Sequence, residues 1–176
     1  MSKFLFCDID GTLTQTISGN AFKQDSTDVK VIECADKAIA YFASQGYKII
    51  GISNQGGIEK RFKSLETTIE EMRYTLQILP QLNVIYFCPD FAGTKCYCVT
   101  REEEKVHNFG AFFPEYQGFF RKPSSGMIDL ALHVSGEVSV ETWMVGDRTE
   151  DEGCAINAGI NFVWADIWRE IYGTAK

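Results

Sequence analysis

The sequence lacks the features of a membrane protein, a repeat protein and a basic nucleic-acid-binding protein. No apolar run approaches the roughly 20 residues of a membrane-spanning helix, and there is no internal repeat or low-complexity tract. Positive charge is in deficit, because 17 Lys and Arg residues face 24 Asp and Glu residues, for a net charge of −7. This net negative charge argues against a protein whose whole surface is basic and binds nucleic acid. It does not exclude a local basic rim around a binding site.

A secretory signal is also missing. The first residues, MSKFLFCDIDG, contain no small-residue cleavage site and lead directly into acidic residues, so we expect a cytoplasmic protein. In that compartment cysteines are reduced thiols rather than disulfides. The six cysteines are Cys7, Cys34, Cys88, Cys96, Cys98 and Cys154.

The sequence does contain a regular alternation of strand-like and helix-like segments over 176 residues, a length that suits a single domain, residues 1–176. Near-continuous apolar runs predict strands at Lys3–Ile9, Tyr47–Ser53, Asn83–Cys88, Glu141–Gly146 and Asn161–Ala165. Apolar periodicity predicts helices at Asp28–Gln45, Ser64–Leu79 and Ser125–Val134, and a capping box at Thr149 begins a fourth that ends near Gly159. This order is typical of an α/β fold with a mainly parallel sheet.

The segment from Pro89 to Arg121 departs from this alternation. It is rich in aromatic residues, glycine and charge without a clear period, and we expect a long functional loop, residues 89–121, after the third strand. Its six late aromatics leave two interpretations open: bases could stack on them, or they form a small satellite core, which we favour. They are Phe109, Phe112, Phe113, Tyr116, Phe119 and Phe120.

Two carboxylates follow the first strand, in the motif Asp8-Ile9-Asp10-Gly11-Thr12. Residues two apart on a strand point to the same side, and ligands in open α/β sheets bind beyond the carboxyl ends of the strands. Two acids this close repel each other unless a cation or a shared proton relieves them. Mg²⁺ suits carboxylate and phosphate oxygens, so the pair predicts a magnesium site.

Further polar groups follow other strands. Asp147 and Asp151 come after the fourth strand, one helical turn apart, and meet the first pair if the two strands are neighbours. Ser53 ends the second strand and is followed by Asn54, Gln55 and Gly56-Gly57, a turn suited to binding phosphate. Arg121-Lys122 precedes the third helical segment. Lys122 would neutralise a phosphoryl group, and the guanidinium of Arg121 suits a second phosphate or a nucleotide backbone.

The whole set resembles the haloacid dehalogenase (HAD) superfamily of phosphohydrolases. The resemblance rests on DIDGT at 8–12, Ser53, Lys122 and GDRTED at 146–151, in that order. It implies a Rossmann-like parallel sheet of strand order 3-2-1-4-5 with helices on both faces. It also implies that Asp8 is a nucleophile that forms an aspartyl-phosphate, and that Asp10 is the general acid and base.

The same resemblance implies that Mg²⁺ is held by Asp8, the backbone carbonyl of Asp10 and Asp147, with Asp151 supporting its waters. We therefore expect four acidic side chains to converge around one divalent cation. Few residues separate Asp10 from the helix predicted at 28–45, which leaves no room there for a large cap domain. The chain resembles the capless class, whose open site admits large substrates.

Two capless subfamilies share the SNQGGI and RKPSSGM motifs of this chain. The heptose bisphosphate and histidinol phosphate phosphatases carry a zinc loop of the form C-P-H followed by C-x-C. Here Cys88, Cys96 and Cys98 occupy the cysteine positions, Asp90 replaces the histidine, and the stretch 99–120 intervenes before Arg121. We expect a structural zinc at these cysteines, with Asp90 or His107 as the fourth ligand.

The second subfamily is the phosphatase domain of polynucleotide kinase–phosphatases, which removes 3′-phosphates from nucleic-acid ends. Its segment after the nucleophile resembles DGTLTQTISGNAF, residues 10–22, and the cations of EKRFK, residues 59–63, are expected on the rim of the site. We therefore rank nucleic-acid 3′-phosphates first among substrates and small sugar or histidinol phosphates second. A non-catalytic protein whose zinc loop binds a partner is the alternative from another class, and the intact acid set argues against it.

Overall fold

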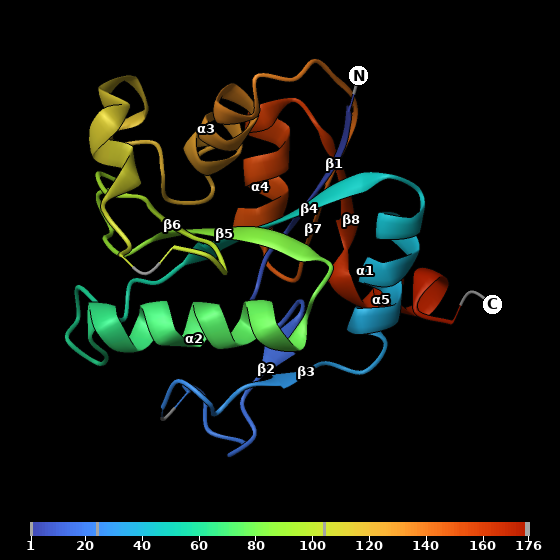
Figure 1. The fold of residues 1–176 in the computed structure, drawn as a ribbon, viewed down its shortest axis with the longest axis horizontal. Helices are drawn as coiled ribbons and strands as arrows, with labels where there is room; N and C mark the ends of the chain where they lie inside the picture. The colour runs from blue at the N-terminus through green and yellow to red at the C-terminus, as the bar shows by residue number, and fades with distance from the viewer. Residues whose placement is uncertain (1, 24, 104, 175–176) are drawn as a thin grey trace.

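The central sheet has six strands in the order β6-β5-β4-β1-β7-β8 (Figure 1). The computed structural model describes residues 2–23, 25–103 and 105–174. The strands are β1 (Ser2–Cys7), β4 (Tyr47–Asn54), β5 (Leu82–Cys88), β6 (Tyr97–Val99), β7 (Ser139–Gly146) and β8 (Asn161–Trp164). All neighbours pair in parallel except β5 and β6. The predicted order 3-2-1-4-5 is confirmed, with β6 added as an antiparallel edge strand.

Helices cover both faces of this sheet. One face carries α1 (Ala35–Ser44), α2 (Leu65–Ile78) and α5 (Ala165–Tyr172), and the other carries α3 (Gly126–Ser135) and α4 (Thr149–Ala158). Strand β1 shows how the two cores form, because alternate side chains of a strand point to opposite faces. Leu5 and Cys7 join the core under α1, α2 and α5, whereas Phe4 and Phe6 join the core under α3 and α4.

The predicted helix at Asp28–Gln45 is wrong in its first part. Helix α1 begins only at Ala35, after Cys34, whose φ of 69° is left-handed. The residues before it form a two-stranded antiparallel hairpin, β2 (Thr14–Gln15) with β3 (Lys30–Val31). Asp28 does not begin a helix, because its carboxylate accepts hydrogen bonds of 2.7 Å from the backbone N–H and the hydroxyl of Ser18. We call residues 14–31 the flap.

The insert at 89–121 is more ordered than the predicted loop. It contains β6 and two 3-10 helices, η1 (Phe109–Phe112) and η2 (Pro114–Tyr116). Arg101 attaches it to the end of α2 by donating hydrogen bonds to the carbonyls of Leu76, Leu79, Pro80 and Leu82. No large cap domain is present among the described residues, and none of their helices is long and apolar enough to span a bilayer.

Candidate active site

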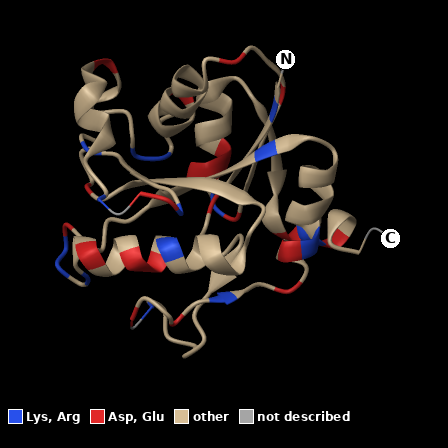
Figure 2. Cartoon of the chain, in the orientation of Figure 1, with Lys and Arg blue, Asp and Glu red and all other residues tan. Residues whose placement is uncertain are grey.

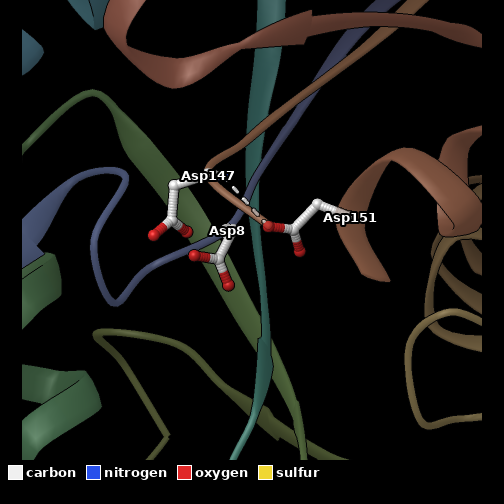
Figure 3. A group of neighbouring side chains, drawn as sticks. All are labelled: Asp8, Asp147 and Asp151. Carbon is white, nitrogen blue, oxygen red and sulfur yellow. Dashed lines mark hydrogen bonds between the residues drawn. The ribbon is translucent and has the colours of Figure 1, made fainter. Parts of the chain in front are cut away.

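Strands β1 and β7 bring the two acidic motifs together. They are parallel neighbours in register, with Cys7 opposite Val145, so both carboxyl ends reach the same edge of the sheet. Asp8, Asp147 and Asp151 lie there with one ligand atom each, all within 4.8 Å of one another (Figure 3). Carboxylate oxygens are the ligands that Mg²⁺ prefers, and the residues present fit that ion.

Two glycines make this approach geometrically feasible. Gly11 has a φ of +91°, which L side chains rarely adopt, and a Cβ there would collide with the carboxylate of Asp147. A Cβ at Gly146 would collide with the side chain of Asp151. The glycines of the DIDGT and GDRTED motifs therefore let the two carboxylates lie against the backbone.

Asp151 also caps the first turn of helix α4. Its Oδ2 accepts hydrogen bonds from the backbone N–H groups of Asp147 (3.1 Å) and Arg148 (3.0 Å). The predicted capping box at Thr149 is shifted by one residue, because the N-cap is Arg148 and the reciprocal carboxylate is Asp151. The side chain of Asp151 thus fixes the turn that presents Asp147.

Lys122 places a cation against the same carboxylates. Its ammonium lies 2.6 Å from Asp8 Oδ1 and 2.7 Å from Asp151 Oδ1, and its side chain is only 2% exposed. The side chain of Asn54 holds the backbone of Lys122, since its Nδ2 donates to the Lys122 carbonyl and its Oδ1 accepts from the Lys122 N–H, both at 3.0 Å. Asn54 therefore positions Lys122, and its amide is already engaged with that backbone.

Burial sets the protonation of Asp8. Removal from water raises the pKa of Asp8 to about 7, although the Lys122 ammonium opposes that shift. For Lys122 burial also disfavours the charged form, but Asp8 and Asp151 outweigh burial and raise the pKa of its ammonium. Lys122 therefore stays positively charged. A further cation beside Asp8 would favour the ionised form of its carboxylate.

The carboxylate of Asp10 lies apart from this group. Its Oδ1 accepts from Lys23 Nζ at 2.6 Å, and its Oδ2 accepts from Gln55 Nε2 at 2.8 Å. Enclosure in the pocket opposes ionisation, yet the Lys23 ammonium lowers the pKa of Asp10 below its usual range. The expectation of four converging acidic side chains is thus corrected to three, because Lys23 and Gln55 hold the fourth.

One pocket of about 390 Å³ is lined by Asp8, Asp10, Lys122 and Asp151. Ser53 contributes to it and is 1% exposed, and its hydroxyl accepts a hydrogen bond of 2.8 Å from Gln55. Arg121 also lines it, with its guanidinium 4.4 Å above the ring of Phe91. Phe22 of the flap and Phe62 after β4 line the pocket as well, each 69% exposed, with their ring centroids 6.2 Å apart.

The sequence interpretation missed several of these residues. It gave no role to Lys23, Phe62 or Glu71, and it named Gln55 only as part of the turn after Ser53. Of the EKRFK cations, Lys63 lines the pocket. The signal available in the sequence was the charged and aromatic run at 59–63, but the hairpin that brings residue 23 to the site has no comparable signature.

The late aromatics of the insert mostly pack rather than line the pocket. Phe120 is fully buried, and Phe109, Phe113 and Tyr116 pack against the same core under α3 and α4. Phe112 and Phe119 are exposed. Since the pocket lining includes none of the six, the satellite-core interpretation is the one that their packing supports.

The arrangement of the predicted zinc ligands does not support a zinc site among the described residues. Among the described residues, the group of three or more His, Cys, Asp and Glu side chains close enough to share an ion is Asp8, Asp147 and Asp151. Cys88 instead donates to Asp90 Oδ1 at 3.2 Å, and Cys96 lies fully buried in the apolar core. Nothing in the arrangement of Cys88, Asp90, Cys96, Cys98 and His107 supports the expectation of zinc.

The chain is similar to several known phosphatases. It is 28% identical over 170 residues to the histidine biosynthesis bifunctional protein HisB of Legionella pneumophila (strain Lens), covering 93% of this chain but 41% of that protein. It is 26% identical over 169 residues to the D-glycero-D-manno-heptose-1,7-bisphosphate 7-phosphatase of Chlorobaculum tepidum, covering 92% of this chain and 77% of that enzyme.

A solved structure shares the fold. The D,D-heptose 1,7-bisphosphate phosphatase from B. bronchiseptica, complexed with magnesium and phosphate, superposes with a TM-score of 0.66 at 19% identity, over 92% of this chain and 79% of that one. The family model for polynucleotide kinase 3 phosphatase matches residues 3–165. With the acids of β1 and β7 and the lysine before α3 in place, the chain belongs to the polynucleotide kinase 3 phosphatase family, among the capless phosphatases of the HAD superfamily.

Proposed function

We propose that the protein is a Mg²⁺-dependent phosphomonoesterase that works through an aspartyl-phosphate. The observation that carries this proposal is the convergence of Asp8, Asp147 and Asp151, with the buried Lys122 ammonium 2.6 Å from Asp8. Mg²⁺ held by Asp8, Asp147 and the backbone carbonyl of Asp10, with Asp151 supporting it, would neutralise negative charge on the phosphoryl group and on Asp8.

The chain supplies the groups for two balanced steps. In the first, an Asp8 oxygen bonds to phosphorus while the bond from phosphorus to the leaving oxygen breaks, and the Asp10 carboxyl, which enters this step protonated, gives its proton to that oxygen. In the second, water bonds to phosphorus, Asp10 takes a proton from it, and the bond from Asp8 to phosphorus breaks to release inorganic phosphate. Lys122 and Ser53 bind the phosphoryl oxygens during both steps.

For the substrate we propose 3′-phosphorylated nucleic-acid ends. The lining of the pocket combines two exposed rings, Phe22 and Phe62, with the cations Lys63, Arg121 and Arg148. Bases stack on aromatic side chains, and cations pair with the backbone phosphates of a strand. The family match supports the same substrate class. The overall negative charge confines such binding to this local rim.

A small sugar or histidinol phosphate is the second candidate. The names of the curated relatives favour it. Against it, this chain forms no zinc loop among its described residues and carries the insert that precedes Arg121.

A phosphate-release panel tests both the chemistry and the substrate. It compares a 3′-phosphorylated oligonucleotide, a 5′-phosphorylated one, heptose bisphosphate and histidinol phosphate, each with Mg²⁺ and with a chelator. We expect Mg²⁺-dependent release that is fastest from the 3′-phosphate. Preference for either small molecule would overturn the substrate but leave the chemistry intact, and no release from any ester would contradict the enzymatic proposal itself.

A further inference from the structure

Lys23 is a flap residue whose ammonium is buried inside the site. Its side chain is 5% exposed. Its contacts are Asp10 Oδ1 at 2.6 Å, Glu71 Oε1 at 2.9 Å and the hydroxyl of Thr14 at 3.2 Å. An ammonium has three N–H donors, so each of these contacts can use one of them.

Glu71 holds this lysine from the other side. It lies on α2, its side chain is 1% exposed, and each of its oxygens meets a different lysine, Lys23 at 2.9 Å and Lys63 at 2.8 Å. Figure 2 shows Lys and Arg on the loop before α2 and bands of Asp and Glu on the helix. The ion pairs of Glu71 reach Lys63 on that loop and Lys23 on the flap. A buried ion network of this kind is weak evidence for stability, because burial costs much of what pairing returns. Its position beside Asp10 suggests a role in the reaction.

The ion network of Lys63, Glu71 and Lys23 ends at Asp10, the proposed general acid and base. One carboxyl oxygen of Asp10 accepts a hydrogen bond from Lys23 at 2.6 Å, and the other accepts one from Gln55 at 2.8 Å. Gln55 is itself fixed by its bond to Ser53, and Lys23 is fixed by Glu71. Two donors from different elements therefore determine the rotation of the Asp10 carboxyl group. Proton transfer depends on such orientation, because a displacement of about 1 Å costs roughly a hundredfold in rate.

We propose that Lys23 is a positioning residue that orients Asp10 for proton transfer, and that Glu71, itself paired with Lys63, holds Lys23 in place. This inference rests on the proposed function, since it assigns a role within that reaction. Lys23 acts through Asp10 and need not touch the substrate. The distinctive consequence is that losing Lys23 harms a reaction most when its leaving oxygen requires a proton.

The test compares two substrates of similar size in the full chain with Mg²⁺. Benzyl phosphate releases an alkoxide that needs a proton, whereas p-nitrophenyl phosphate releases a stable phenolate. The quantity measured is kcat/KM, which covers only the steps up to formation of the aspartyl-phosphate when that step is irreversible. The variants are Lys23→Met and Glu71→Gln, with Lys30→Met on β3 and Glu70→Gln on α2 as exposed controls.

We expect Lys23→Met to reduce kcat/KM for benzyl phosphate by about 100-fold, the low end for a general acid, with a loss of less than about 5-fold for p-nitrophenyl phosphate. Glu71→Gln should show the same asymmetry to a smaller extent, and the controls should match the wild type. Equal losses with both substrates would overturn the inference, because they would indicate phosphate binding or a purely structural role. Absence of any loss would also overturn it.

The two levels of proposal fail in different ways. If the wild type releases phosphate neither from these two esters nor from any ester of the phosphate-release panel with Mg²⁺, the proposed function fails and the role of Lys23 falls with it. If the wild type is active and the variants show no asymmetry, only the positioning role fails. Should Lys23→Met not fold, as judged by circular dichroism, Glu71→Gln carries the same comparison, because it keeps the shape of the side chain.

Discussion

Lys122 Nζ lies 2.6 Å from Asp8 Oδ1, so the proposed phosphate-binding cation and the proposed nucleophile form one buried ion pair. The same ammonium bonds Asp151 at 2.7 Å. A phosphoryl group entering the site would therefore meet a lysine whose position is already fixed by two carboxylates and, through Asn54, by its own backbone. Such preorganisation is what electrostatic catalysis requires.

Asp8→Asn should abolish turnover while leaving the fold intact. The amide cannot form the aspartyl-phosphate, and we expect kcat to fall by at least about 1,000-fold, as for other lost nucleophiles. Phosphate release from the best ester of the panel measures this, with circular dichroism to verify folding. Asp36→Asn, an exposed acid in the first turn of α1, is the matched control and should retain full activity. Normal rates in Asp8→Asn would exclude the aspartyl-phosphate.

Lys122→Met should destabilise the protein as well as inactivate it. The change leaves Asp8 and Asp151 buried without their cation, and breaking a buried pair from one side costs about 3–5 kcal/mol. Urea denaturation measures the loss in the free energy of unfolding. The control is Lys48→Met, whose partner Glu137 forms an exposed pair with it, and it should cost under about 1 kcal/mol. Equal costs for the two variants would contradict the buried pairing.

The stabilisation by Mg²⁺ should grow with pH. Burial raises the pKa of Asp8 to about 7 in the folded chain, whereas it is about 4 when unfolded. Ionised Asp8 thus destabilises the metal-free fold, and this penalty develops as pH rises from about 4 and is complete above about 7. Because Mg²⁺ binds the carboxylate and competes with the proton, the rise in Tm on adding Mg²⁺ should be small at pH 5.5 and larger at pH 8.

The control for this measurement is Asp8→Asn, which has no carboxyl to titrate at this position. Its response to Mg²⁺ should be weaker and should lack the component centred near pH 7. A wild-type response that is flat from pH 5.5 to pH 8 would contradict the link between Asp8 and the ion.

Phe22→Ala and Phe62→Ala should each weaken the use of an oligonucleotide but not of a small ester. Loss of one stacked base costs about 1–3 kcal/mol, so kcat/KM for the 3′-phosphorylated oligonucleotide should fall about 10-fold. The value for p-nitrophenyl phosphate should change little. Phe112→Ala, an exposed ring away from the pocket, serves as the control. An equal loss with both substrates would argue against a stacking role.

The acidic site was predictable from the sequence because its parts obey local rules. Asp8 and Asp147 each follow an apolar strand, and the carboxyl ends of neighbouring parallel strands meet at one edge. Lys122 was identifiable through the motif that contains it. The order of the five parallel strands followed from the family resemblance and is confirmed.

The missed features depend on contacts between distant segments. Lys23 reaches Asp10 only because a hairpin of short strands replaces the first part of the predicted helix, and Glu71 is visible only when α2 is packed against that hairpin. Helix α5 follows β8 directly, whereas the predicted strand ended at Ala165 and no helix was predicted after it. The zinc expectation is not supported, because Cys88 and Cys96 lie buried in the apolar core under α3 and α4, and no zinc-ligand group is found among the described residues.

The two ends of the insert are anchored independently of its interior. The insert begins after Cys88 of β5, which pairs with Asn54 of β4, and it ends just before Lys122. The side-chain amide of Asn54 forms hydrogen bonds with both the N–H and the carbonyl of Lys122. Evolution could therefore lengthen, shorten or replace the intervening residues without moving Lys122, the proposed phosphate-binding lysine. A grafted module at this position would sit next to the reaction centre and would change which molecules reach it, while the hydrolytic chemistry stayed the same.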